Sequence, residues 1–248
     1  MRIDLDWLLE VLTIPHPIYN MMAGNINISK FCATVSHVIS DSSKCDTYTL
    51  TSLLERGEHL DLMFSQWFNS LPNNRLPRKA QSPTGESIIL YPDSTSAGVW
   101  NYYRGTRIIL QRVILQIHRS LEILVLGNAF TSGTFLPRNP EEIIVEMIGE
   151  ICESIPFSLG DLDIFGQHTP DSSYGKVGIK AVQGFALMWP LFSVPQSGYA
   201  TQEQESQARE ALRRIATTHG IRMGIVMSLE EVQLGRSCSS HSSASGQS

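Results

Sequence analysis

The clearest hydrophobic pattern in the chain lies between Trp100 and Leu126. Apolar side chains there recur at spacings of three, four or seven residues, which places them on one broad arc of a helix. They are Trp100, Tyr103, Leu110, Ile114, Ile117, Leu121 and Leu124. The stretch contains no proline and a single glycine, Gly105, so it predicts a helix of roughly 27 residues and about 40 Å. We expect the other elements to pack around this helix.

Shorter helices are predicted on both sides of this stretch. Apolar residues at helical spacing mark residues 2–12, 28–39, 48–71, 139–154, 179–192, 202–218 and 221–234. The start near Asn139 is well defined, because Asn139 can cap the helix, Pro140 suits its first turn and two glutamates favour its positive end. Pro156 predicts its end, since the residue before a proline leaves the α region.

The predicted fold class is all-α, an irregular multi-helix domain around one long central helix. Residues 87–91 are the best strand candidate. We expect a single helical domain over 1–234, with a flexible proline-rich loop at about 72–87. Residues 235–248 are nearly all serine, glycine and small polar side chains, which predicts a disordered tail.

The segment 48–71 predicts a core-facing helix of its own. Its apolar residues at helical spacing are Leu50, Leu53, Leu54, Leu60, Met63, Phe64, Trp67 and Phe68. Gly57 lies in the middle of this pattern, and the sequence predicts it as a tolerated weak point of the helix.

One cation, Arg107, lies within the apolar arc of the central helix. A buried charge without a partner is very costly, so Arg107 requires a carboxylate or a carbonyl oxygen. Glu150 and Glu153 share one face of the helix after Asn139 and allow three interpretations. They form an exposed acidic flank, which we favour; they are paired catalytic carboxylates; or one of them is the partner of Arg104 or Arg107.

Composition and charge indicate a globular protein with few charges. The chain of 248 residues is 42% hydrophobic and 17% charged, with a formal net charge of −5 and a pI near 5.8. An acidic chain lacks the basic surface on which nucleic-acid binding depends. Two local groups of cations are the alternative: Arg75, Arg78 and Lys79, or Arg209, Arg213 and Arg214.

The cysteines and the chain ends favour an intracellular protein without a membrane span. The four cysteines, Cys32, Cys45, Cys152 and Cys238, include no C-x-x-C pair, which argues against a zinc site and for reduced thiols. The acidic N-terminus does not resemble a signal peptide. No stretch is apolar enough to predict a membrane helix.

Motifs for catalysis or cofactor binding are absent from the sequence. The chain has no G-x-S-x-G, H-E-x-x-H or G-x-x-x-x-G-K-[ST] pattern. His118 is predicted as a packing or boundary residue and His16 as a loop residue. Glu58, His59 and Asp61 point in different directions on a helix, so we expect no shared site. No catalytic, cofactor-binding or metal-binding residue is therefore expected, and no enzyme activity.

A resemblance enters with the segment W-N-Y-Y-R-G-T-R-I-I-L over residues 100–110. It resembles part of the fungal-specific transcription factor domain, the helical regulatory region of fungal zinc binuclear cluster transcription factors. Three further segments look similar to that domain in the same order: 150–160, 185–192 and 212–221, which read E-I-C-E-S-I-P-F-S-L-G, F-A-L-M-W-P-L-F and L-R-R-I-A-T-T-H-G-I.

The resemblance implies a nuclear, all-α domain that regulates transcription through partner contacts or effector response, without catalysis. Genes of this family are common in secondary-metabolite clusters, which is the setting it implies here. The matched residues carry over only as packing and turn positions: Trp100, Tyr103, Arg104, Arg107, Pro156, Trp189 and Pro190. The alternative is a helical protein-interaction scaffold without a transcriptional role.

The sequence departs from the family in one respect. The family's six-cysteine DNA-contacting cluster is absent from these 248 residues. We therefore expect protein partners, the transcription machinery or another transcription factor, in place of direct DNA binding. A truncated gene model, a regulator without a zinc cluster and a chain that binds another factor all remain open, as does a homo- or hetero-oligomer.

Overall fold

The computed structural model describes residues 17–41, 43–82, 84–126, 139–169, 177–218 and 220–229. Its α-helices are α2 (Pro17–Ser40), α3 (Thr47–Gln66), α4 (Ser94–Leu126), α5 (Pro140–Ser158), α6 (Val177–Gln196), α7 (Gln202–Thr218) and α8 (Met223–Leu229). Short 3-10 turns cover Trp67–Ser70 and Asn73–Arg75, and strands β1 (Arg78–Gln81) and β2 (Ser87–Leu90) form an antiparallel pair. The all-α prediction is confirmed, with this small sheet added.

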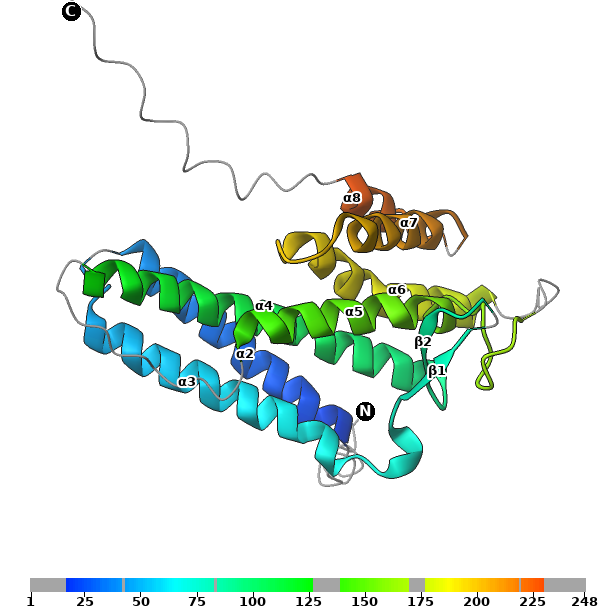
Figure 1. The fold of residues 1–248 in the computed structure, drawn as a ribbon, viewed down its shortest axis with the longest axis horizontal. Coiled ribbons are helices and arrows are strands. Elements are labelled where there is room, and N and C mark those ends of the chain that lie inside the picture. Colours follow the sequence, from blue (N-terminus) through cyan, green and yellow to red (C-terminus); the bar gives the residue numbers. More distant parts are fainter. Residues whose placement is uncertain are drawn as a thin grey trace, which may run out of the picture.

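Helix α4 is the central element, as the hydrophobic pattern predicts. It has 33 residues and contacts α2, α3, α5 and α6. In Figure 1, α2 and α3 lie on one side of α4, whereas α6, α7 and α8 lie on its other side. Helix α5 runs alongside α4. The helix begins six residues before Trp100 because Asp93 caps it: the Asp93 carboxylate accepts from the Ser96 amide at 2.7 Å.

Capping residues also start the other well-defined helices. Asp46 accepts from the Thr49 amide at 2.7 Å at the start of α3. Asn139 accepts from the Glu141 amide at 3.0 Å, so the predicted cap of α5 is confirmed. Thr201 and Gln204 bond each other's amides reciprocally before α7.

Helix α5 continues past its predicted end. Pro156 lies inside α5, which ends at Ser158. A proline this close to the C-terminus removes one hydrogen bond and leaves the final turn possible, because Leu159 still donates to the Ile155 carbonyl at 2.9 Å. Pro190 and Pro195 likewise lie inside α6, so Pro156 and Pro190 are helical positions and not turns.

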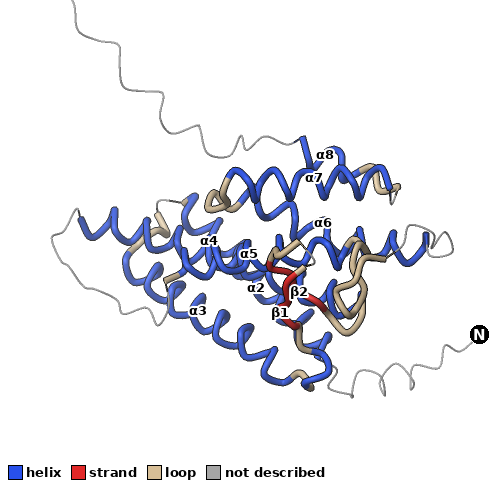
Figure 2. Tube along the Cα trace, turned by 45° about the vertical axis from the view of Figure 1, so that its right-hand side comes forward, coloured by secondary structure: helices blue, strands red, loops and turns tan. Residues whose placement is uncertain are grey.

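The stretch 72–87, predicted as loop, instead contains strand β1 and the start of β2. Figure 2 shows the two strands at one end of the bundle, beside the loop that follows α5. β1 has three exposed positions in its four residues, so it carries no hydrophobic signal. β2 buries Ile88, Ile89 and Leu90, and its prediction as a strand is confirmed.

Helices α2, α3 and α4 meet closely at Gly57. A Cβ placed there would lie 3.0 Å from Phe31 of α2 and 3.0 Å from Ile114 of α4. Gly57 is therefore a close-packing position and not a weak point. Met63, predicted to face the core, is 57% exposed, because α4 packs on the other side of α3.

Three predicted features lie outside the described residues: the helix over 2–12, His16, and the tail over 235–248. The last helix is described only as far as Leu229. In the described part of the chain, no helix is long and apolar enough to span a bilayer.

Candidate functional site

Arg104 is the most buried cation of the described chain. Its side chain is 1% exposed, between α4 and α5. Nε donates to Glu150 Oε2 at 2.9 Å, and Nη1 donates to Asn101 Oδ1 at 3.0 Å and to the Tyr91 hydroxyl. Its guanidinium also lies 5.6 Å from the ring centroid of Trp100. Every side of the cation thus has a partner of suitable chemistry.

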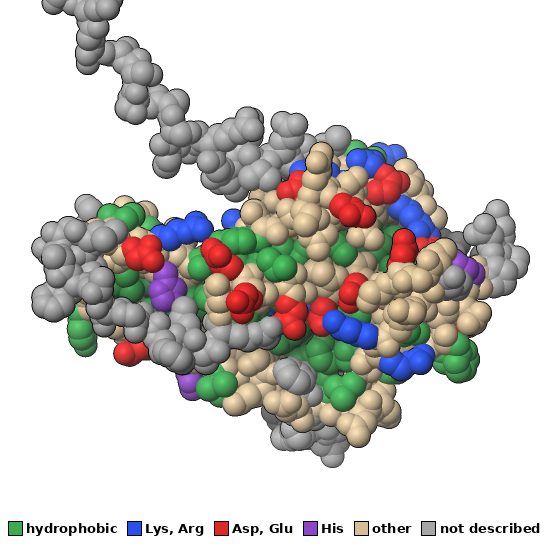
Figure 3. All heavy atoms as spheres, viewed as in Figure 1, with side chains coloured by type: hydrophobic (Ala, Val, Ile, Leu, Met, Phe, Trp, Pro, Cys, Tyr) green, Lys and Arg blue, Asp and Glu red, His purple; other side chains and the backbone are tan. Residues whose placement is uncertain are grey.

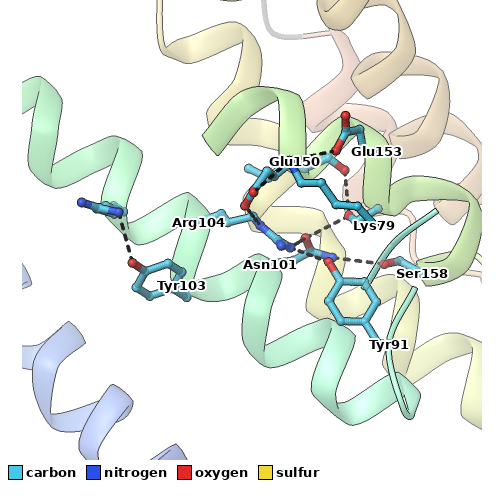
Figure 4. Close-up of polar contacts among 11 residues, drawn as sticks. Lys79, Tyr91, Asn101, Tyr103, Arg104, Glu150, Glu153 and Ser158 are labelled. Carbon is cyan, nitrogen blue, oxygen red and sulfur yellow. Dashed lines mark hydrogen bonds and ion pairs between the residues drawn. The ribbon is translucent and has the colours of Figure 1, made fainter. Parts of the chain in front are cut away.

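The Arg104 cluster extends along α5 through neutral side chains (Figure 4). Asn101 accepts from the Ser154 hydroxyl at 2.9 Å and donates to the Ser158 hydroxyl at 3.1 Å. Lys79 of β1 reaches Glu150 at 3.5 Å and Glu153 at 3.8 Å. The cluster joins α4, α5 and the β-hairpin, and it leaves no open space for a substrate beside Arg104.

Arg104 stays charged and Tyr91 stays neutral near neutral pH. Burial alone would lower the pKa of Arg104, but Tyr91 and Glu150 outweigh burial and the pKa is raised. Burial raises the pKa of Tyr91, partly offset by Arg104. With both pKa values raised, the Arg104 guanidinium stays charged and the Tyr91 phenol stays neutral near neutral pH, so the two groups exchange no proton there. The arrangement is therefore a packing contact and not an acid–base pair.

A second buried ion pair connects α4 to α3. Arg107 binds Asp61 with two hydrogen bonds, Nε to Oδ1 at 2.8 Å and Nη2 to Oδ2 at 3.0 Å. Nη1 donates to the Tyr103 hydroxyl at 3.2 Å. The pKa of Arg107 is raised, because Asp61 and Tyr103 outweigh the burial that would lower it.

The predicted need of Arg107 for a partner is confirmed, but the partner is Asp61. The sequence interpretation set Asp61 aside together with Glu58 and His59, since neighbouring helix positions diverge. Glu150 pairs with Arg104, which confirms the third interpretation of the two glutamates. The favoured interpretation, an exposed acidic flank, is wrong, because Lys79 covers Glu150 and Glu153 and leaves their side chains 20% and 26% exposed.

Five of the six cations proposed as alternative nucleic-acid contacts lie beside carboxylates of the chain, and the sixth, Arg78, donates to the Ile164 carbonyl at 3.3 Å. Arg75 binds Asp93 at 2.7 Å, and Lys79 binds Glu150. Arg214 binds Asp161, Arg213 binds Glu210, and Arg209 lies 3.8 Å from Glu205. Figure 3 shows acidic side chains gathered along the middle of one face, with separate cations beside them and no continuous basic surface on that face.

A cavity of about 380 Å³ opens between α4 and α6. Its lining is mainly apolar and includes Tyr102, Ile109, Trp189, Pro190 and Phe192, with Arg112 as its cation. Tyr102, Ile109 and Trp189 are 43%, 45% and 57% exposed. Trp189, predicted as a packing residue, is thus a wall of an open cavity, which we call the α4/α6 groove.

Sequence reasoning missed the α4/α6 groove, although one signal was present. Tyr102 and Ile109 are large apolar residues outside the core arc of α4, and they are seven positions apart. Two such residues on the polar side of an amphipathic helix indicate a second, smaller apolar stripe. Where Trp189 would lie relative to that stripe depends on the packing of α6.

A more polar hollow of about 430 Å³ lies between the β-hairpin and the loop after α5. Glu86, Asp161 and His168 are among its lining residues. Asp161 is already bound by Arg214, and within the described ranges no three metal-ligating side chains come together. The Ser82 and Thr84 hydroxyls in its lining bond each other at 2.8 Å, and the Thr169 hydroxyl donates to the Gly160 carbonyl.

His118 and Cys152 lie outside these clusters and cavities. His118 is half-buried, and its Nε2 is buried without a hydrogen-bond partner among the described residues. Cys152 is buried, and its pKa is raised to about 12 by burial and by Glu153. A protonated buried thiol is a poor nucleophile, so Cys152 is a core residue.

We compared the chain with protein-family models, curated proteins and solved structures, and none of them matches it.

Proposed function

We propose that the chain is a regulatory domain of the fungal-specific transcription factor type, which controls transcription in the nucleus through contacts with other proteins and not through catalysis. One observation carries this proposal. The four segments on which the resemblance rests form one packed unit, and that unit contains the α4/α6 groove.

The contacts within this unit connect all four segments. Residues 100–110 of α4 meet residues 150–160 of α5 through the Arg104–Glu150 pair at 2.9 Å. Residues 185–192 of α6 lie against α4 at Gly105, where a Cβ would be 3.2 Å from the Pro190 Cα. Residues 212–221 belong to α7 and its end, and α7 packs on α5 and α6.

The chemistry of the described sites favours an interaction domain over an enzyme. Enzymes place titratable groups with shifted pKa values at an accessible cavity. Here the buried ion pairs around Arg104 and Arg107 do not line the open α4/α6 groove, which is mainly apolar and has Arg112 as the one charged residue among its described lining residues. Exposed apolar surface of this kind is typical of binding sites. It also suits the second candidate, an interaction scaffold without a transcriptional role.

The test joins the full chain to an unrelated DNA-binding module beside a reporter gene. We expect the tagged fusion to enter the nucleus and change reporter output severalfold. Trp189→Ala should remove most of this change, because it removes an exposed wall of the groove. Ile123→Ala is the matched control, since Ile123 is 74% exposed on α4 and does not line the groove.

The outcomes separate the two candidates. A folded, nuclear fusion that leaves the reporter unchanged but captures the same proteins as the unfused chain would favour the scaffold. If the Trp189→Ala and Ile123→Ala fusions change reporter output equally, the contact surface lies outside the groove.

A further inference from the structure

The α4/α6 groove forms where the residues along one line of the α4 surface change from two glycines to an arginine. Gly98, Gly105 and Arg112 follow one another at intervals of seven residues, so they lie near one line on the helix surface. At Gly98 a Cβ would lie 3.1 Å from the Ala186 Cβ, and at Gly105 it would lie 3.2 Å from the Pro190 Cα. The two helices therefore touch at both glycines.

Arg112 occupies the next position of this line, where its long side chain stands in place of a glycine that would allow α4 and α6 to touch. It lines the groove together with Ser193 and Gln196 from the last turn of α6. The groove thus combines a close helix contact at Gly105 and Pro190, apolar walls, and one guanidinium, that of Arg112.

The environment of Arg112 differs from that of the other cations of α4. Arg104 and Arg107 each hold a carboxylate at 2.9 Å or less. No acceptor within the described ranges is assigned to the Arg112 guanidinium. Partial burial lowers the pKa of Arg112, and the opposing influence is the Tyr199 phenol, which is itself bonded to Arg119 and Glu141. Arg112 is an exposed cation at the groove, without a matching anion in the described part of the chain.

We propose that the α4/α6 groove binds a small organic acid with a flat apolar or aromatic body, and that Arg112 pairs with its carboxylate. The volume of about 380 Å³ falls within the range of small-molecule sites. Tyr102, Ile109 and Trp189 supply apolar walls, and the planar guanidinium suits a carboxylate through two parallel hydrogen bonds. This site follows from the groove alone and does not depend on a role in transcription.

A partner helix is the competing occupant. Such a helix normally needs a continuous apolar groove that receives anchors over several turns. Here the lining on α4 runs only from Tyr102 to Arg112, about three helical turns, and the close contact between Gly105 and Pro190 interrupts it within that length. The short, interrupted lining favours a small ligand.

The experiment measures binding of 1-naphthaleneacetate and of its uncharged amide to the full-length protein by isothermal titration calorimetry. We expect the acid to bind at least about tenfold more tightly than the amide, as a charge-assisted hydrogen bond would give. Arg112→Gln should remove that preference. Arg222→Gln is the control, because Arg222 is an exposed arginine outside the groove.

A second variant tests the apolar wall independently of the charge. Trp189→Ala should weaken the acid and the amide by a similar factor and keep the preference between them. Arg112→Gln and Trp189→Ala both alter exposed side chains, so the melting temperature of each variant should match that of the parent.

Several results would overturn the proposal. Equal affinity for acid and amide would remove the role of the carboxylate, and an unchanged preference in Arg112→Gln would remove that of Arg112. Absence of binding by either probe at millimolar concentration would reject a small-acid site. Binding of an acidic amphipathic peptide, without binding of the probes, would assign the groove to a protein partner. The reporter experiment probes the Trp189 wall of the same groove but not the acid–amide preference or its dependence on Arg112, so the calorimetric result can fail while the reporter responds, and the reverse.

Discussion

Arg104 and Glu150 form an ion pair at 2.9 Å between α4 and α5, with the arginine side chain 1% exposed and the glutamate 20% exposed. The pair fixes the rotation of α4, because the same arginine also holds Tyr91 after β2. The Arg107–Asp61 pair at 2.8 Å connects α4 to α3 in the same way. Two buried cations about one helical turn apart thus tie the central helix to two different neighbours.

Glu150→Ala should destabilise the protein strongly. It leaves the Arg104 charge buried with only neutral acceptors and leaves Lys79 next to it, and breaking a buried pair in this way typically costs about 3–5 kcal/mol. The free energy of unfolding from urea titration measures the loss. Glu122→Ala is the control, since Glu122 is exposed on α4, and it should change stability by less than about 0.5 kcal/mol.

A double-mutant cycle then measures the interaction free energy between Arg104 and Glu150 apart from the cost of burying each charge. Arg104→Met combined with Glu150→Met should be less destabilised than the sum of the two single variants, because neither charge is left alone. Additive losses would show that the two side chains do not interact in the folded protein.

Asp61→Ala should cost more stability than Arg107→Met. The first variant leaves a cation that is 9% exposed without its carboxylate, whereas the second leaves the Asp61 side chain, 16% exposed, with easier access to water. We expect losses of roughly 3 and 1–2 kcal/mol respectively. Thermal unfolding of both variants beside Glu55→Ala, an exposed position on α3, measures the order. An unchanged melting curve for Arg107→Met would contradict burial of this pair.

The sequence was sufficient to predict that Arg107 has a partner but not to predict which residue it is. Burial of Arg107 follows from its position in the apolar arc, and the cost of an unpaired charge follows from physics. The choice of Asp61 depends on how α3 rotates against α4, and that rotation is set by contacts distant in sequence, such as Phe64 with Tyr103 at 4.9 Å between ring centroids.

Local signals predicted helices well where capping and periodicity agreed. Helix α7 has the predicted bounds, 202–218, because a polar cap precedes a clean amphipathic pattern. Strand β1 was missed because Arg78–Gln81 has no apolar alternation and pairs with β2 only through its backbone. The α4/α6 groove arises where two helices diverge, so it was visible only in the three-dimensional structure.

Gly57→Ala should destabilise the protein although alanine favours helices. Its methyl group would lie 3.0 Å from both Phe31 and Ile114, and overpacking of this kind costs about 1–3 kcal/mol. Gly149→Ala in α5 is the matched control, because its methyl group would meet no atom within 4 Å. We expect that control to gain about 0.5–1 kcal/mol. Equal shifts in melting temperature for the two variants would refute the close approach at Gly57.

Stability should fall as the pH rises above 9. Burial keeps Cys152 protonated in the folded protein, with a pKa of about 12 against an ordinary value of 9.0. Between these values the folded state binds more protons than the unfolded state, so this group's stabilisation is complete below pH 9 and declines toward pH 12. Its slope is at most about 1.4 kcal/mol per pH unit. Buried Tyr91 and Tyr103 have raised pKa values and act in the same direction.

Comparison with Cys152→Ala isolates the thiol from all other groups. Urea titrations at pH 8, 9, 10 and 11 should give a steeper decline for the parent than for the variant. Parallel declines would mean that the Cys152 thiol ionises as freely in the folded state as in the unfolded state.

The chain should bind duplex DNA weakly and without sequence preference. Its net charge is −5, and Arg75, Arg213 and Arg214 pair with carboxylates, so few counterions would be released from DNA. Fluorescence anisotropy with a random duplex at ~0.15 M salt should show no binding tighter than ~10⁻⁴ M. A micromolar dissociation constant that weakens steeply with added salt would contradict this. Arg209, Arg213 and Arg214 would then be the first residues to substitute, because they lie near one another on α7.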